Sequence, residues 1–179
     1  LAGKAISEAK TVRDVPHLLR PADDLSEFYS NVADCERLHW IGRHRAGRLM
    51  RSPTVWEDLV KTICTTNCSW GLTKIMVSNL VEKLGAGTTA NAFPTAAAMA
   101  SMKEGFYRTE IKAGYRSPYF IELAEAVASG KLDPETWLTS DLPTAELRKE
   151  MKKVKGVGDY AADNLLKLAM SLGELGKNQ

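Results

Sequence analysis

The sequence lacks several features that would assign a protein to a class at once. It has only three cysteines, Cys35, Cys64 and Cys68, and their spacing is irregular. This argues against a disulfide framework and favours a reducing compartment. No apolar run approaches the ~20 residues that span a bilayer, and the first residues contain no signal-peptide core. Internal repeats and low-complexity linkers are also missing. We therefore expect a soluble, intracellular globular protein that does not bind membranes.

Cys64 and Cys68 lie one helical turn apart and could share a metal ion. No histidine is near them in the sequence, and two ligands are too few for a structural zinc site. The pattern therefore favours thiols of the core or the surface.

The net charge is only +2 over 179 residues. A polyanionic partner must therefore be argued from local clusters of charge. The segment 43–51 carries four arginines and no acidic residue. From charge alone this segment is either a strip that faces DNA or a solvated connector.

Strand signals are scarce, and the periodicity of apolar residues predicts an all-α protein. The pairs Ser52–Pro53 and Ser117–Pro118 each resemble a helix start, with a capping hydroxyl followed by proline. Asp23 or Asp24 is expected to cap another helix. Helices are expected over residues 24–29, 53–64, 75–84, 95–102 and 117–127, with a short one from Asp133–Pro134. One apolar stripe is expected in the core: Trp56, Leu59, Val60, Ile63 and Cys64.

The most informative segment is 147–166, which predicts two short helices joined by the turn Gly156-Val157-Gly158. Two glycines let the backbone approach another molecule closely, and the second helix begins at once with free amide groups. Such a helix end attracts phosphate. Five basic residues add charge nearby: Arg148, Lys149, Lys152, Lys153 and Lys155. The pattern is typical of a helix-hairpin-helix that grips a DNA backbone without reading its sequence.

Three segments in this order, 53–67, 113–119 and 147–166, resemble the helix-hairpin-helix superfamily of base-excision DNA glycosylases. The resemblance extends from Asp23 to the C-terminus and leans toward the 8-oxoguanine and alkylbase (3-methyladenine) branches. It implies a two-lobed helical bundle. Residues 1–51 would be an N-terminal helical segment of the outer lobe, and residues 52–179 the lobe with the hairpin.

The resemblance also implies how a duplex would be held. A glycosylase extrudes the damaged nucleotide and fills the hole. Asn67 matches a position that contacts the orphaned base, Tyr115 an aromatic wedge, and Arg116 a contact to a base or phosphate. The amides of Gly156 to Gly158 would hold a phosphate. Without the family, Asn67 would be interpreted as a helix cap, and the other two as a buried tyrosine and a surface arginine.

Relatives often bind an alkali ion through hairpin carbonyls, which Lys152, Val154 and Val157 would supply here for Na⁺ or K⁺. No cofactor is required, and no nucleotide cofactor is expected. Bifunctional relatives carry a nucleophilic lysine at the position of Tyr160, and a phenol cannot form a Schiff base. An active protein of this sequence would therefore be monofunctional.

The catalytic aspartate of relatives would fall near Asn178 or beyond the end of the chain, and no aspartate is found there. We expect Asp159 to cap the second helix and Asp163 to lie within it, so neither is favoured as the catalytic group. The C-terminal part of relatives is therefore expected to be missing. The chain would be a fragment of a longer enzyme, a truncated inactive protein, or an enzyme that uses another residue.

Two functions remain in view from the sequence. The first is a DNA-repair glycosylase that hydrolyses the N-glycosidic bond of a damaged base in duplex DNA, an alkylated base being slightly favoured. The second is an inactive or truncated helix-hairpin-helix module that only binds DNA. A generic helical interaction protein, with a fortuitous Gly-Val-Gly turn, would show no salt-dependent affinity for duplex DNA.

Overall fold

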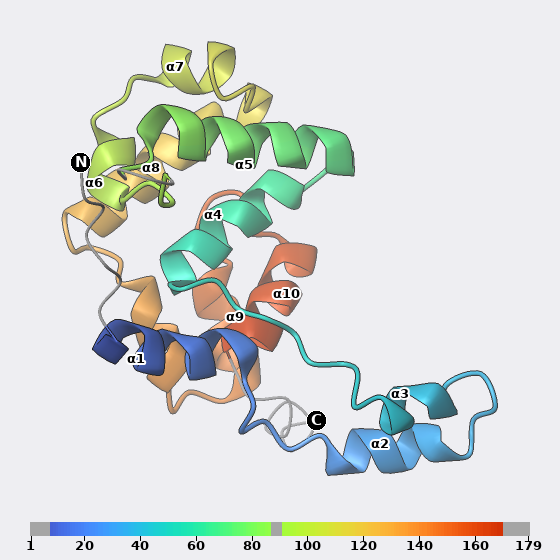
Figure 1. Cartoon of the computed structure of the whole chain (residues 1–179). Coiled ribbons are helices and arrows are strands. Elements are labelled where there is room, and N and C mark those ends of the chain that lie inside the picture. The colour runs from blue at the N-terminus through green and yellow to red at the C-terminus, as the bar shows by residue number, and fades with distance from the viewer. Residues whose placement is uncertain (1–7, 87–90, 170–179) are drawn as a thin grey trace.

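The computed structural model describes residues 8–86 and 91–169, and every regular element in these two ranges is a helix (Figure 1). The all-α prediction is therefore confirmed. No helix among the described residues is long and apolar enough to cross a membrane. The α-helices are α1 (Glu8–Leu19), α2 (Ser26–Ala33), α3 (His39–Arg43), α4 (Val55–Thr65), α5 (Trp70–Leu84), α6 (Ala96–Ala100), α7 (Glu104–Thr109), α8 (Ser117–Ala128), α9 (Thr144–Met151) and α10 (Asp159–Ala169). Two short 3₁₀ helices, η1 (Gly114–Arg116) and η2 (Pro134–Thr139), complete them.

Helix α4 is the centre of the core. It lies between α5 and α10 in Figure 1 and also contacts η2. The predicted apolar stripe of this helix is buried, and Leu59, Val60 and Ile63 are fully inaccessible to solvent. Burial of each such side chain stabilises the fold by roughly 1.5–3 kcal/mol. Because α4 is held on three sides, the turn that follows its last residue has a well-defined position.

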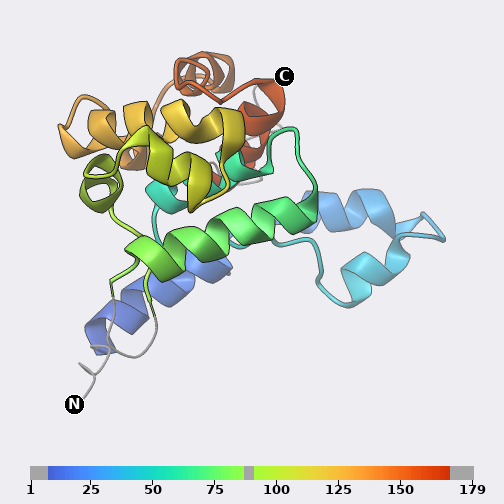
Figure 2. The ribbon, with the colours of Figure 1, turned by 90° about the horizontal axis from the view of Figure 1, so that it is seen from above.

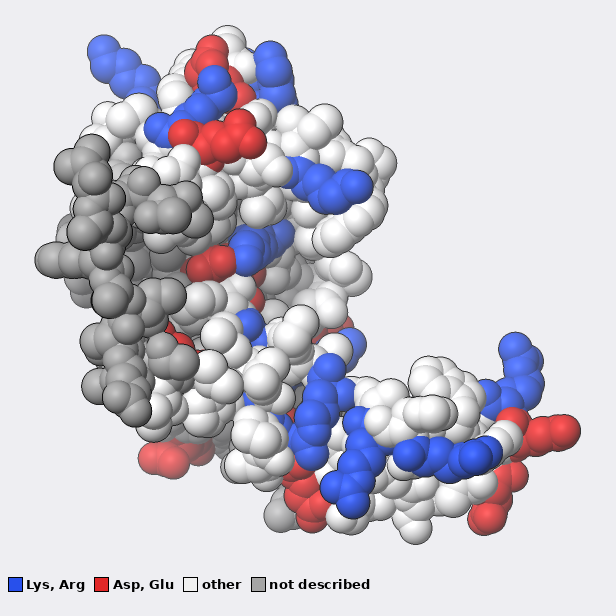
Figure 3. Space-filling view, viewed as in Figure 1, with Lys and Arg blue, Asp and Glu red and all other residues white. Residues whose placement is uncertain are grey.

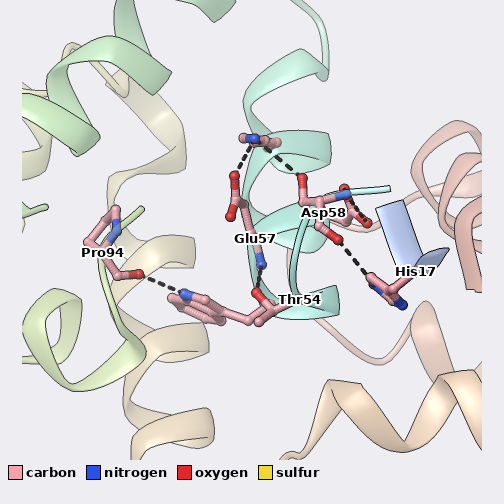
Figure 4. Close-up of polar contacts among 8 residues, drawn as sticks. His17, Thr54, Glu57, Asp58 and Pro94 are labelled. Atoms are coloured by element: carbon pink, nitrogen blue, oxygen red, sulfur yellow. Dashed lines mark hydrogen bonds and ion pairs between the residues drawn. The ribbon is translucent and has the colours of Figure 1, made fainter. Parts of the chain in front are cut away.

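Helix α4 begins two residues later than the Ser52–Pro53 pair predicted. The hydroxyl of Thr54 accepts the amide N–H of Glu57 at 3.2 Å and so provides the N-cap (Figure 4). The Ser52 amide instead donates to both carboxylate oxygens of Asp58, at 3.0 and 3.2 Å. A threonine in extended backbone conformation next to the first helical turn is the better placed cap.

A second, long-range cap also fixes the start of α4. Glu135 of η2 accepts the amides of Val55 and Trp56, each at 3.0 Å. The Trp56 indole N–H donates to the carbonyl of Pro94 at 2.9 Å (Figure 4). A carboxylate at the positive end of a helix is stabilising. The start of α4 is therefore tied to segments about 40 and 80 residues further along the chain.

The second Ser–Pro pair begins α8 as predicted, but not as a cap. The Ser117 hydroxyl donates to the carbonyl of Gly114 at 2.7 Å, because η1 runs directly into α8. Asp24 does accept the amide of the first residue of α2 at 2.9 Å, and Asp133 caps η2 through the Glu135 amide at 3.1 Å. Asp133 thus occupies the N-cap position of η2, whereas the N-cap position of α2 is Leu25, one residue after Asp24.

Helices α2 and α3 project from the rest of the molecule as an arm, residues 26–47 (Figures 1 and 2). The buried residues of the main core all lie between Val55 and Ala169. Arg51 connects the base of the arm to that core, since its guanidinium donates to the carbonyls of Leu168 and Ala169 at the end of α10. Arg20 adds a bond to the carbonyl of Lys167 at 2.7 Å. The boundary after residue 51 and the two-lobe division stay predictions.

Candidate nucleic-acid interface

The turn between α9 and α10 has the geometry that its two glycines predict, but the glycines have different roles. Gly156 has a φ of +90°, and a Cβ added there would lie 3.0 Å from the Tyr119 ring and 3.4 Å from Ile63. At Gly158 a Cβ would meet nothing within 4 Å. Val157 between them is 5% exposed and anchors the turn in the core. Gly156 is therefore needed for the fold, whereas Gly158 leaves a backbone surface open.

The amides of this turn differ in the same way. The Val157 amide donates to the carbonyl of Val154 at 3.0 Å and is already used within the turn. The amides of Gly156 and Gly158 have no acceptor among the described residues. The predicted phosphate grip therefore has two free amides rather than three, because the middle amide closes the turn.

The basic residues around the hairpin are all paired with carboxylates. Arg148 binds both Asp159 and Asp163, at 2.8 and 2.6 Å, and Lys152 binds Asp159 at 2.6 Å. These contacts hold the pKa of the Asp159 carboxyl below its usual value, chiefly through the hydrogen bond from Lys152. Three further pairs are Lys149–Glu146, Lys153–Glu150 and Lys155–Glu122. Asp159 is thus the first residue of α10 and an ion-pair partner, and Asp163 lies within the helix as expected.

Asn67 lies in the turn between α4 and α5, directly after Thr66, which is the C-cap residue of α4. Its backbone is left-handed, with a φ of +45°, and its side chain is exposed. No described residue forms a hydrogen bond with its amide group. It does not cap α5, because the Ser69 hydroxyl does so by accepting the amide of Leu72 at 3.3 Å. The exposed Asn67 side-chain amide can therefore donate and accept hydrogen bonds with a ligand.

Tyr115 and Arg116 lie in η1, opposite the end of α4. Tyr115 is 49% exposed, and its ring packs edge-on against Tyr119 at 6.1 Å between centroids. The Arg116 guanidinium stacks 4.5 Å from the centre of the Tyr115 ring. The guanidinium also donates to the Ile63 carbonyl at 3.2 Å and to the Thr66 hydroxyl at 3.3 Å.

Arg116 is only 3% exposed in this arrangement. This differs from the direct contact to a base or phosphate that the sequence predicted, because the end of α4 captures the guanidinium. Arg116 therefore holds the Asn67 turn and the Tyr115 ring in place from behind.

All three segments meet at one open groove of about 710 Å³. Asn67, Tyr115 and the hairpin turn line the same hollow, although they are up to 91 positions apart in the chain. Tyr119, Thr65 and Thr66 line it too and were missed by the sequence analysis. The spacing of Tyr119, one helical turn after Tyr115, was the only available signal for it.

Tyr160 is 63% exposed and also lines the groove. No lysine occupies its position, as the sequence showed, and the lysines at the groove are those of the ion pairs described above. Asn178, near which a catalytic aspartate was expected, lies outside the described residues. Asp159 lines the groove, but cations already contact its carboxylate.

The hairpin carbonyls proposed for an alkali ion are compatible with that task. The Val154 carbonyl accepts one hydrogen bond from Val157, and no described residue donates to the carbonyls of Lys152 or Val157. Carbonyl oxygens have two lone pairs and are ligands that hard cations accept. The alkali-ion site stays a prediction.

Cys64 and Cys68 lie in or against the core. Cys64 is buried, and burial raises the pKa of its thiol to about 12. The Cys68 thiol donates to the Cys64 carbonyl at 3.0 Å. No group of three or more histidine, cysteine or acidic side chains that could hold a metal is found among the described residues. Cys64 is therefore a thiol of the core, and Cys68 is partly buried against it.

Comparison with known proteins bears on this arrangement. No family model matches the sequence. The N-glycosylase/DNA lyase of Saccharomyces cerevisiae is 27% identical over 122 residues, which cover 60% of this chain and 32% of the yeast protein. The match thus spans about a third of the length of that relative.

Solved structures agree over more of the chain. The 8-oxoguanine glycosylase/lyase of Clostridium acetobutylicum, in complex with DNA containing cytosine opposite 8-oxoguanine, has a TM-score of 0.75 at 24% identity, covering 90% of this chain and 56% of that one. The 3-methyladenine DNA glycosylase from Archaeoglobus fulgidus has a TM-score of 0.69 at 20% identity, with the same coverage. The chain therefore has the fold of these DNA glycosylases, which is the fold that its sequence motifs indicated.

Proposed function

We propose that this chain is the DNA-binding part of a base-excision glycosylase that binds duplex DNA, extrudes a damaged base and supports hydrolysis of its N-glycosidic bond. The observation that carries the proposal is the groove itself. It brings together the exposed Asn67 amide, the half-exposed Tyr115 ring and the free amides of Gly156 and Gly158. A duplex substrate implies an intracellular location, in a bacterial cytoplasm or nucleoid or in a nucleus.

In this proposal each part of the groove has one task. The amides of Gly156 and Gly158 bind a phosphate of the backbone, since an unpaired amide pair at a helix start favours an anion. Tyr115 wedges into the stack, where an aromatic ring offsets lost base stacking by about 1–3 kcal/mol. Asn67 donates to and accepts from the orphaned base. Arg116 positions Asn67 and Tyr115 without touching DNA.

The proposal also predicts the type of product. Tyr160 supplies no amine, and the Lys152 ammonium is engaged with Asp159 at 2.6 Å. Base release should therefore leave an abasic site without breaking the strand. Duplexes with a single 3-methyladenine, hypoxanthine, uracil or 8-oxoguanine would be incubated with the protein and analysed with and without alkali. Breaks that appear only after alkali support the proposal, and breaks without alkali contradict the monofunctional mechanism.

A second candidate is a DNA-binding module without catalysis. One observation favours it: Asp159, the carboxylate that lines the groove, contacts both Arg148 and Lys152. A carboxylate that must stabilise a cationic sugar is poorly served by two bound cations. Salt-sensitive duplex binding with no base release from any of the four lesions would support this module.

A further inference from the structure

The hairpin has little net charge with which to attract DNA. Each of its basic side chains, from Arg148 to Lys155, contacts an acidic one within 2.8 Å. Those pairs are largely exposed and each adds little stability, but together they cancel the local field. The free amides orient one phosphate, whereas long-range attraction and most backbone affinity need uncompensated cations.

The densest group of arginines lies elsewhere, in residues 37–51. This strip holds five arginines, two histidines and no acidic residue. The whole chain has a net charge of +2, so when the +5 of the strip is subtracted, the remaining 164 residues carry −3. The strip therefore carries more positive charge than the chain as a whole.

The arginines of the strip fall into two groups. Arg48 and Arg51 are tethers: Arg48 donates to the carbonyls of Arg20 and Asp23 at 2.6 and 2.9 Å, and Arg51 to the end of α10. Arg37, Arg43 and Arg45 are exposed, and none of them contacts an acidic residue within the described part of the chain. The tethers hold the arm, and the other three cations point to solvent.

The arm shows two more features. Trp40 of α3 is 50% exposed and lies three residues before Arg43. Arg45 has a left-handed backbone with a φ of +49°, which is uncommon for a side-chain-bearing residue. An exposed aromatic ring beside several arginines is a combination used on nucleic-acid strands.

The arm projects on the side of the molecule where α5 and α10 begin (Figures 1 and 2), and the turns before these two helices contribute Asn67 and Gly156 to Gly158 to the groove. Figure 3 shows the outline hollowed between α5 and the arm. Basic side chains cover the front and upper edge of the arm in that view, and acidic ones lie at its outer end and lower edge. The acidic residues of the arm belong to α2 and the turn after it: Glu27, Asp34 and Glu36.

We propose that the arm, through Arg37, Arg43 and Arg45, is a second DNA-binding surface that holds the phosphate backbone of the duplex whose damaged base enters the groove. This inference rests on the proposed function, since it assumes that the groove receives duplex DNA. The hairpin then orients one phosphate, and the arm provides the counterion release that gives affinity.

The test compares two variants that remove the same charge. In the arm variant, Arg43→Gln and Arg45→Gln remove two unpaired cations. Glutamine also carries a Cβ, so the left-handed backbone at position 45 is as unfavourable in the variant as in the wild type. In the control, Lys103→Gln and Lys131→Gln remove two exposed cations that contact no acidic residue among those described; Lys103 precedes α7 and Lys131 follows α8, both away from the arm in Figure 1. The affinity for an undamaged fluorescent duplex is measured by anisotropy over a series of salt concentrations, after thermal unfolding has shown that all proteins are folded.

For two lost phosphate contacts, the slope of log affinity against log salt should become shallower by about 1.8, with roughly ten- to sixtyfold weaker binding near 0.1 M salt. The control should keep the wild-type slope. Equal slopes for arm variant and control would overturn the arm proposal while the proposed function stands. Absence of salt-dependent duplex binding by the wild type would overturn both. The same anisotropy measurement is repeated with a single-stranded RNA probe. If the arm variant loses affinity for the RNA but not for the duplex, the arm proposal is refuted and RNA is favoured as the ligand of the arm.

Discussion

The two hairpin glycines allow one sharp test, because the same substitution should do different things two residues apart. Gly156→Ala places a Cβ at a φ of +90° and 3.0 Å from the Tyr119 ring. The left-handed backbone costs an alanine about 1–3 kcal/mol. The crowded ring adds about 1 kcal/mol, since ordinary carbon contacts lie at about 3.5–4.0 Å. We expect a loss of about 2–4 kcal/mol in the free energy of unfolding.

Gly158→Ala is the matched control for the fold. Its Cβ meets no atom within 4 Å, and its φ lies outside the left-handed region. The residue precedes α10, where alanine is a poorer cap than glycine, so the loss should stay below about 1 kcal/mol. The exposed methyl group would, however, stand beside the free amide. If that amide binds a phosphate, losing a charge-assisted hydrogen bond weakens DNA binding by about tenfold or more.

Urea denaturation and duplex-binding anisotropy on both variants separate the two effects. For a chain of this size, Gly156→Ala should lower Tm by about 5–15 °C. Equal stability of the two variants would refute the left-handed, closely packed turn. Wild-type DNA affinity in Gly158→Ala would show that the backbone at this position does not face DNA.

The other predictions concern the helix ends, one buried carboxyl and the proposed wedge. Glu135→Gln removes the charged double cap of α4 and should cost about 1–2 kcal/mol by urea denaturation, whereas an unchanged midpoint would mean that the Thr54 cap suffices. Arg51→Met removes the donors to the end of α10 and should cost about 2–3 kcal/mol by the same assay, and Arg51→Lys should not restore it if the forked guanidinium matters. Burial raises the pKa of the Asp58 carboxyl, so the folded state retains the proton to higher pH than the unfolded state; the stability it contributes is present below the unfolded pKa and is lost as pH rises through the folded value. Asp58→Asn should flatten this part of the profile of unfolding free energy against pH, and a profile that keeps the wild-type slope would contradict the assignment. Tyr115→Ala should leave stability nearly unchanged but weaken binding to a damaged duplex by about 1–3 kcal/mol, with Tyr115→Phe as the control that keeps the ring.

Much of the fold could be predicted from local sequence patterns. The stripe of α4 and the hairpin were predictable because apolar spacing and glycine placement act over a few residues. Local caps were less reliable: Ser52 and Ser117 were both expected to cap helices, and their polar groups bond Asp58 and Gly114 instead. The Glu135 cap could not be foreseen, since it joins residues about 80 positions apart.

The candidate site shows the same division. Sequence motifs selected Asn67, Tyr115 and the hairpin glycines, and these do share a groove. The chemistry of Arg116 was not visible in the sequence, because its burial depends on the end of α4 packing against η1. The balance of charge was hidden as well, since a run of lysines looks basic until the carboxylates that contact it are known.

The sequence by itself determined the helical class, the core stripe and the position of a Gly-Val-Gly turn, because these depend on residue type and spacing within one or two turns. Only the tertiary structure decided which cations are free. Arg148 and the hairpin lysines meet acids from their own and neighbouring helices, whereas Arg37, Arg43 and Arg45 meet none among the described residues. Whether a cation can attract DNA depends on its distance from the nearest carboxylates, and those distances are set by how the helices pack.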